Sequence, residues 1–300
     1  MQILKEIQLP SPNAVDLSRH RHQTLQRVRS LPPFPATAVR LLAISTGSDT
    51  AMRDFEAVFK ADPALATELL RAANSAEFGF RAKIASIRHA LALMGLEAVR
   101  SLAFRLSLHA YAGRSPHSVA IQSIWAHSLA TAAIAERLGR VANSQVPLLY
   151  TASLLHDIGR LGLILGVGQP YTLAMQREYE TLAEANEMER LVFGVTHAEA
   201  GAVLAEHWAL PEILADCIRN HHIRPAVGPL GILELVQVAC QLADTVGFPE
   251  LLKAPALDDS DVRKGWPGYL TDHPELAPGR LKRLAAENIS DVFACPRLVN

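Results

Sequence analysis

Residues 154–160 read Leu-Leu-His-Asp-Ile-Gly-Arg, so an imidazole and a carboxylate stand side by side at the end of an apolar run. Adjacent side chains can bind one ion only where the backbone lets them converge, and a helix end followed by glycine allows this. A helix-terminal histidine followed by a capping aspartate explains the dipeptide equally well. His156 and Asp157 are therefore candidate metal ligands that need support from the rest of the chain.

Imidazole and carboxylate groups recur on the apolar faces of four further expected helices. These helices cover residues 117–139, 197–208, 211–222 and 230–245, and their candidate ligands are His127, His197, His221, His222 and Asp244. Each residue alone has an ordinary alternative, such as a core histidine bonded to a carbonyl or a histidine pair at a helix C-terminus. Together, such groups are costly to bury without a partner. They indicate a site without thiolate for one or two divalent ions, such as iron, manganese or zinc.

The spacing of apolar residues predicts an all-α fold. Asp62-Pro63 places a capping residue before a first-turn proline and opens a helix that Asn74-Ser75 ends. Other helices are expected at about 96–110, 147–157 and 179–192, with a weaker amphipathic stretch at 279–293.

Proline-rich and polar stretches predict the domain organisation. Residues 31–35 form a stiff turn, and the composition shifts to Pro, Asp and Lys after Gly247. We expect an N-terminal extension at 1–30, a two-lobed helical bundle at 31–247 and a C-terminal appendage at 248–300. The N-terminal lobe would span about 31–112, and the second lobe, about 113–247, would carry the polar cluster.

Composition excludes several function classes. With 29 basic and 30 acidic residues scattered along the chain, the formal charge is −1, and no direct DNA binding is expected. Three distant cysteines offer neither a disulfide framework nor a CxxC zinc site. The N-terminus lacks the pattern of a signal peptide, and polar residues interrupt the apolar stretch 148–168. We expect a cytoplasmic protein without a membrane span.

The order His127, His156-Asp157, Asp244 resembles the signature of the HD superfamily of metal-dependent phosphohydrolases. His197 and His221-His222 resemble the additional ligands of its HD-GYP branch, which hydrolyses cyclic di-GMP. The resemblance implies that Asp157 bridges two metal ions, that His156 and Asp244 bind one of them, and that the other histidines complete the pair.

Motifs along residues 31–247 are similar to those of HDOD domains. They are Leu31-Pro32-Pro33-Phe34-Pro35, Asp62-Pro63-Ala64-Leu65, the segment 70–79, Met94-Gly95-Leu96, Phe193-Gly194, the segment 197–201, Trp208-Ala209-Leu210-Pro211 and His221-His222. The resemblance implies an HD-domain-like fold and a regulatory protein without established hydrolase activity. Ile223 replaces the Glu that HD-GYP proteins have after the paired histidines, and residues 223–231 lack a Gly-Tyr-Pro loop.

Arg160 is the remaining candidate, because its guanidinium could clamp a phosphate. A surface cation near a helix end is the alternative. The working hypothesis is a bacterial signal-transduction module that acts by binding other signalling proteins or a ligand and retains a metal framework. The alternative is a metal-dependent phosphodiesterase for a nucleotide or cyclic dinucleotide.

Overall fold

The computed structural model describes residues 14–32, 49–75, 118–223, 230–251, 258–264 and 266–293, together with parts of 35–44 and 80–107. All regular structure in these residues is helical, which confirms the predicted all-α class. Pro33, Phe34, residues 76–79 and residues 224–229 lie outside the described part, as does much of the helix expected at 96–110.

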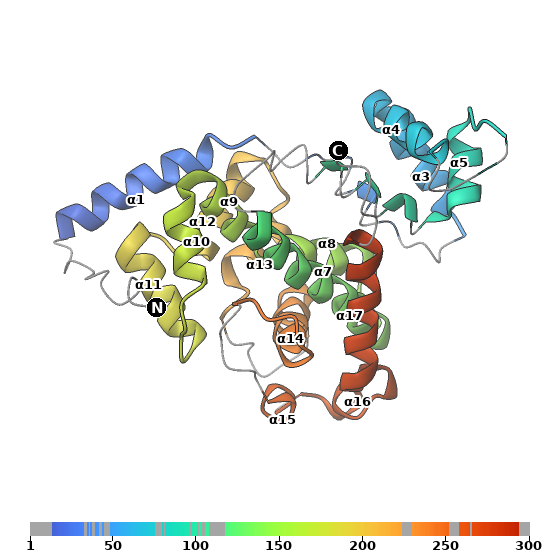
Figure 1. Ribbon diagram of the computed structural model, residues 1–300. Coiled ribbons are helices and arrows are strands. Elements are labelled where there is room, and N and C mark those ends of the chain that lie inside the picture. The colour runs from blue at the N-terminus through green and yellow to red at the C-terminus, as the bar shows by residue number, and fades with distance from the viewer. Residues whose placement is uncertain are drawn as a thin grey trace, which may run out of the picture.

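A large bundle holds all the predicted ligands. Its helices are α7 (Ser118–Val141), α8 (Val146–Leu155), α9 (Ile158–Val167), α10 (Gln169–Met175), α11 (Leu182–Phe193), α12 (His197–His207), α13 (Glu212–Asn220) and α14 (Ile232–Thr245). Helix α7 packs against α8 and α14, and α12 packs against α9 and α13. Because α7 and α8 bury apolar residues around most of their circumference, they lie inside the bundle (Figure 1).

Three shorter helices, α3 (Ala51–Ala61), α4 (Pro63–Ala73) and α5 (Ile87–Met94), pack against one another around a second core. Figure 1 shows them at one side of the large bundle. The Asp62 carboxylate accepts a hydrogen bond from Leu65 N at 3.0 Å, so the predicted cap of α4 is confirmed. The expected lobe boundary near residue 112 lies outside the described residues and stays a prediction.

The flanking segments contribute to the large core. Helix α1 (Ala14–Arg29) packs on α9, α11 and α12 and buries Val28. After α15 (Asp259–Val262), α16 (Gly268–Thr271) and η1 (Pro274–Leu276), helix α17 (Pro278–Phe293) lies along α7. Leu270 and Leu281 belong to the same core. The described parts of the segments expected as extension and appendage thus pack on the bundle.

The stretch Leu148–Val167, which comprises most of α8 and all of α9, is long and apolar enough to cross a membrane. However, 83% of its most apolar window is buried inside the protein. A core helix passes the same test, so this stretch is weak evidence for a membrane span.

Candidate metal centre

The break between α8 and α9 brings His156 and Asp157 to one site. His156 caps the end of α8, and Asp157 stands immediately before α9. A Cβ on Gly159 would lie 1.8 Å from the carbonyl oxygen of His197, so glycine is required where α9 crosses the start of α12. This close approach sets Asp157 beside His197, with 3.7 Å between Oδ1 and Nε2.

Hydrogen bonds to backbone carbonyls fix three of the histidines. The Nδ1 atoms of His127, His156 and His221 lie 2.8, 2.6 and 2.8 Å from the carbonyl oxygens of Phe248, Ser153 and Ile218. Because a carbonyl can only accept, each Nδ1 carries the hydrogen and each neutral ring keeps a lone pair on Nε2. This is how a protein orients imidazole for a metal ion.

His197 is fixed by a carboxylate instead. It begins α12, where Thr196 and Glu199 form a capping box. Glu189, on the buried face of α11, accepts hydrogen bonds from the His197 backbone nitrogen at 2.7 Å and from Nδ1 at 2.8 Å. Glu189 is therefore the outer partner of this imidazole.

The free nitrogen atoms face one another. Nε2 of His127 lies 3.2 Å from Nε2 of His156, and Nε2 of His197 lies 2.8 Å from Nε2 of His222. The rings of His156 and His221 are in edge contact, with centroids 5.0 Å apart, so the histidines form one continuous cluster. Two lone pairs at 3.2 Å repel unless a cation lies between them.

Several buried atoms of the cluster have no hydrogen-bond partner. These atoms are His221 Nε2, Asp157 Oδ1 and Glu250 Oε2. Buried polar atoms in proteins are almost always satisfied, so three such atoms at one place indicate a missing ligand. Imidazole nitrogen and carboxylate oxygen suit a divalent transition metal. The residues present fit such an ion.

The ligand atoms fall into two groups, each with all atoms within 4.8 Å of one another. One group is His197, His221, His222 and Glu250, and the other is His127, His156 and Cys240. The structure thus brings five predicted histidines together and adds Glu250 and Cys240. Sequence indicated a site without thiolate, yet Cys240 Sγ lies 3.5 Å from His127 Nε2.

Asp157 and Asp244 belong to neither group, and their ligand roles stay predictions. Asp244 Oδ1 accepts a hydrogen bond from Glu250 N at 2.9 Å and lies 3.6 Å from His127 Nδ1. In this arrangement Asp244 orients Glu250 and supports His127.

Arg160 lies inside the cluster rather than at the surface. It is 1% exposed, so the surface-cation interpretation is wrong. Its Nε lies 3.0 Å from Asp157 Oδ2, its Nη1 lies 3.2 Å from Glu189 Oε1, and its Nη2 pairs with Glu250. The guanidinium is thus already engaged by three carboxylates, and the phosphate-clamp role stays a prediction.

Burial and neighbouring charges set the protonation states. Burial lowers the pKa of His127 and His197 and lowers the pKa of His156 and His221 further, which keeps these imidazoles neutral.

The pKa values of the buried carboxyl groups are shifted in different directions. Burial raises the pKa of Asp157 well above its usual value. Burial acts in the same direction on Glu250, but Arg160, His222 and His197 outweigh it and hold the pKa of Glu250 well below its usual value. The pKa of Glu189 falls to about 2, because His197 and Arg160 likewise outweigh its burial. Arg160 therefore keeps Glu250 and Glu189 ionised.

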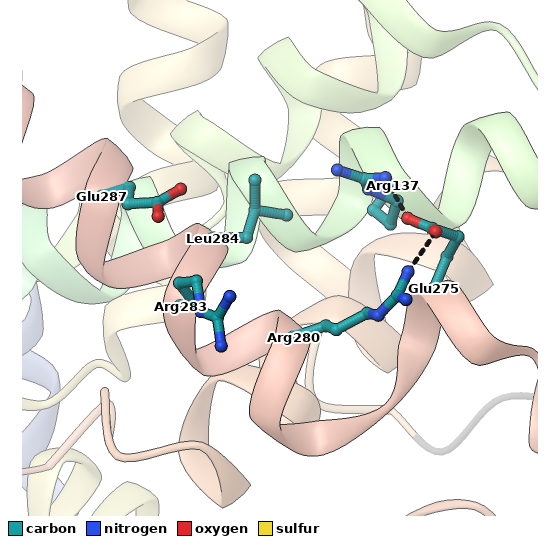
Figure 2. Close-up of a pocket in the computed structure, with 6 residues that line it drawn as sticks. All are labelled: Arg137, Glu275, Arg280, Arg283, Leu284 and Glu287. Carbon is teal, nitrogen blue, oxygen red and sulfur yellow. Dashed lines mark hydrogen bonds and ion pairs between the residues drawn. The ribbon is translucent and has the colours of Figure 1, made fainter.

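A surface pocket of about 310 Å³ lies apart from the cluster. It is lined by Arg137, Glu275, Arg280, Arg283, Leu284 and Glu287, from α7, η1 and α17 (Figure 2). Glu275 pairs with both Arg137 and Arg280 there. None of the predicted ligands lines this pocket.

A comparison of the sequence with models of known protein families assigns the chain to one of them. The model of the HDOD domain matches residues 31–224, which is more than half of the chain. The chain belongs to the HDOD domain family. The matched segment of this HDOD protein contains five histidine candidates and Asp157, whereas Cys240, Asp244 and Glu250 follow it. Helix α1 precedes it.

Known proteins resemble the HDOD chain in sequence and fold. An uncharacterized protein of Treponema pallidum (strain Nichols) is 27% identical over 203 residues, which are 66% of this chain and 39% of that protein. The chain thus spans well under half the length of this relative.

Known crystal structures share the fold, among them two that match most of this chain. An HDOD domain protein of unknown function from Geobacter sulfurreducens has a TM-score of 0.54 at 24% identity, with 91% of this chain and 90% of that chain covered. A proposed signal transduction protein from Marinobacter aquaeolei VT8 has a TM-score of 0.55 at 20% identity, with 95% and 66% covered.

Proposed function

We propose that this HDOD protein is a signal-transduction regulatory module that acts by binding another signalling protein or a ligand. In this proposal the histidine cluster holds a divalent ion, such as iron, manganese or zinc, as structural support. Family membership supports the regulatory role, and the Marinobacter protein of the same fold is a proposed signal transduction protein.

The burial of the candidate ligands away from solvent carries the proposal. Catalytic metal sites keep a position open for water or substrate, whereas structural sites are closed by protein ligands. His127, His156, Asp157, His197 and His221 are all buried, and among the predicted ligands His222 has the most exposed side chain, at 18%. Such a site suits an ion that holds helices together better than an ion that turns over a dinucleotide.

A bound ion would link distant parts of the bundle. The two ligand groups join α7, α8 and α14 on one side, and α12, α13 and the segment after α14 on the other. The ion would supply positive charge where imidazole and carboxylate lone pairs converge. Arg160 supplies the fixed positive charge next to it and keeps Glu250 ionised.

The first experiment measures metal content and melting of protein purified without chelator. We expect bound divalent metal in the wild type and less in Asp157→Ala. Chelator should destabilise the wild type, because an ion at a hundredfold excess over its Kd adds about 2.7 kcal/mol. Asp49→Ala, at an exposed turn before α3, is the matched control and should behave as the wild type. If wild type and Asp157→Ala contain no metal and melt alike with and without chelator, the metal proposal fails.

The second experiment tests the phosphodiesterase alternative. The partly exposed His222, 3.1 Å from Glu250, is the feature that favours it. A panel of nucleotides and cyclic dinucleotides would be incubated anaerobically with iron- or manganese-loaded protein. We expect no turnover of cyclic di-GMP near the enzymatic range of about 1 per second or faster. Steady hydrolysis that Asp157→Asn abolishes would replace the regulatory proposal with the enzymatic one.

A further inference from the structure

Cys240 lies at the histidine cluster although the metal ligands of the fold were expected to be imidazole and carboxylate. It is on α14, one turn before Asp244, and is 3% exposed. Its Sγ lies 3.5 Å from Nε2 of His127, and with Nε2 of His156 the three atoms lie within 4.8 Å of one another.

Two of the three distances among these atoms match neighbouring ligand positions of a tetrahedral zinc ion. With Zn–N bonds of about 2.0–2.1 Å and a Zn–S bond of about 2.3 Å, neighbouring ligand atoms lie about 3.3–3.6 Å apart. The observed separations are 3.2 Å between the two nitrogens and 3.5 Å between His127 nitrogen and sulfur. Both nitrogens carry lone pairs, because both Nδ1 atoms donate to carbonyls. Without an ion, these lone pairs point at each other.

We propose that His127, His156 and Cys240 form a thiolate-containing subsite that binds a zinc ion. This inference rests on the proposed metal binding and assigns the cluster two positions of different chemistry. The subsite of two nitrogens and one sulfur is soft and selects zinc. His197, His221, His222 and Glu250 offer three nitrogens and one oxygen, which suits iron or manganese as well.

A second buried cysteine provides a matched control. Cys217 is fully buried on α13 and belongs to neither ligand group among the residues that the structure describes. Burial is therefore common to both cysteines, and proximity to imidazole nitrogen distinguishes Cys240. A Ser substitution changes each side chain by one atom.

The experiment is zinc-edge X-ray absorption on the full-length, zinc-loaded protein, with zinc stoichiometry measured on the same samples. We expect a sulfur scatterer at about 2.3 Å in the wild type. Cys240→Ser should lose that scatterer and about one zinc per chain, while Cys217→Ser should keep both. Cobalt-loaded wild type gives a second measurement that needs no variant, because thiolate ligation adds a charge-transfer absorption that nitrogen and oxygen ligands lack.

The outcomes separate the two proposals. Zinc bound with nitrogen and oxygen alone, and cobalt without the thiolate absorption, would overturn the Cys240 subsite and leave the metal proposal standing. A sulfur scatterer that persists in Cys240→Ser would come from Cys217 or Cys295 and would also overturn the subsite. Protein that binds no metal at all would overturn both.

Discussion

Arg160 carries its charge in the centre of the cluster, where Asp157, Glu189 and Glu250 surround the guanidinium. The Tyr171 hydroxyl, 3.3 Å from Nη1, completes its partners and also donates to Glu189 at 2.7 Å. Burying these charges is costly, so their mutual attraction is what makes the arrangement tolerable. Removing the cation alone would leave carboxylates buried without compensation.

Arg160→Met should therefore lower the free energy of unfolding by about 3–5 kcal/mol, the usual cost of breaking a buried ion pair from one side. Chemical denaturation measures this change. Arg280→Met is the matched control, because Arg280 pairs with Glu275 at the surface and should cost less than about 1 kcal/mol. Equal effects of the two substitutions would contradict the structural role of Arg160.

Periodicity could have revealed two of the three residues that sequence analysis missed. Glu189 stands seven residues after Leu182 on the buried face of α11, and Cys240 stands eight residues after Ile232 on that of α14. Both therefore lie on apolar helical stripes. Glu250 follows the end of α14 in a segment without periodicity, and only the fold carries it back to His222.

At the scale of elements, the crossing of α9 and α12 holds Asp157 and His197 together. Gly159→Ala should destabilise the protein by about 1–3 kcal/mol or more, because a methyl group would overlap the backbone of α12. It should also reduce metal content by moving His197 away. Gly279→Ala, at an exposed position of α17 with no atom within 4 Å of the new Cβ, should instead add up to about 1 kcal/mol. Thermal melting and elemental analysis would detect both effects, and a wild-type-like Gly159→Ala would refute the close contact.

Sequence analysis predicted most helices of the large bundle more completely than the other helices. Apolar spacing and caps located α7, α11, α12, α13 and α14 to within a few residues. Helix α1 was treated as a polar extension, because its many arginines and histidines hide the few residues, such as Val28, that it buries. Helix α9 was missed because its stretch Gly-Arg-Leu-Gly is a poor helix pattern, which tertiary packing on α12 overrides.

At the scale of the whole molecule, the cluster makes stability depend on pH. In metal-free protein the pKa values of His127, His156, His197 and His221 lie below the value of about 6.5 in unfolded chains. The unfolded chain therefore binds more protons below that pH. For each extra proton that the unfolded chain binds, the free energy of unfolding falls by about 1.4 kcal/mol per unit of decreasing pH. The raised pKa values of Asp157 and Asp244 oppose this loss of stability at low pH, but these two carboxyls are outnumbered by the four imidazoles.

We therefore expect chelated protein to lose stability as the pH falls from about 6.5 to 5. Urea unfolding at a series of pH values measures the slope. His207→Asn, at an exposed histidine, should not change it, whereas His221→Asn should flatten it. A stability that rises as the pH falls through this window would show that the imidazoles are not buried in neutral form.

The hydrogen bond from His127 Nδ1 to the Phe248 carbonyl joins residues 121 positions apart. It can therefore form only late in synthesis, after both residues have left the ribosome. The helices α3 to α5 all lie within residues 51–94 and can condense soon after they leave the ribosome. The cluster cannot, because its last members, Glu250 and the carbonyl of Phe248, emerge long after His127. Until then His127 lacks its carbonyl partner, and a nascent chain would expose the surface of α7 that α14 covers. If the cluster binds the proposed ion, its full set of ligands is available only after residue 250 has been synthesised.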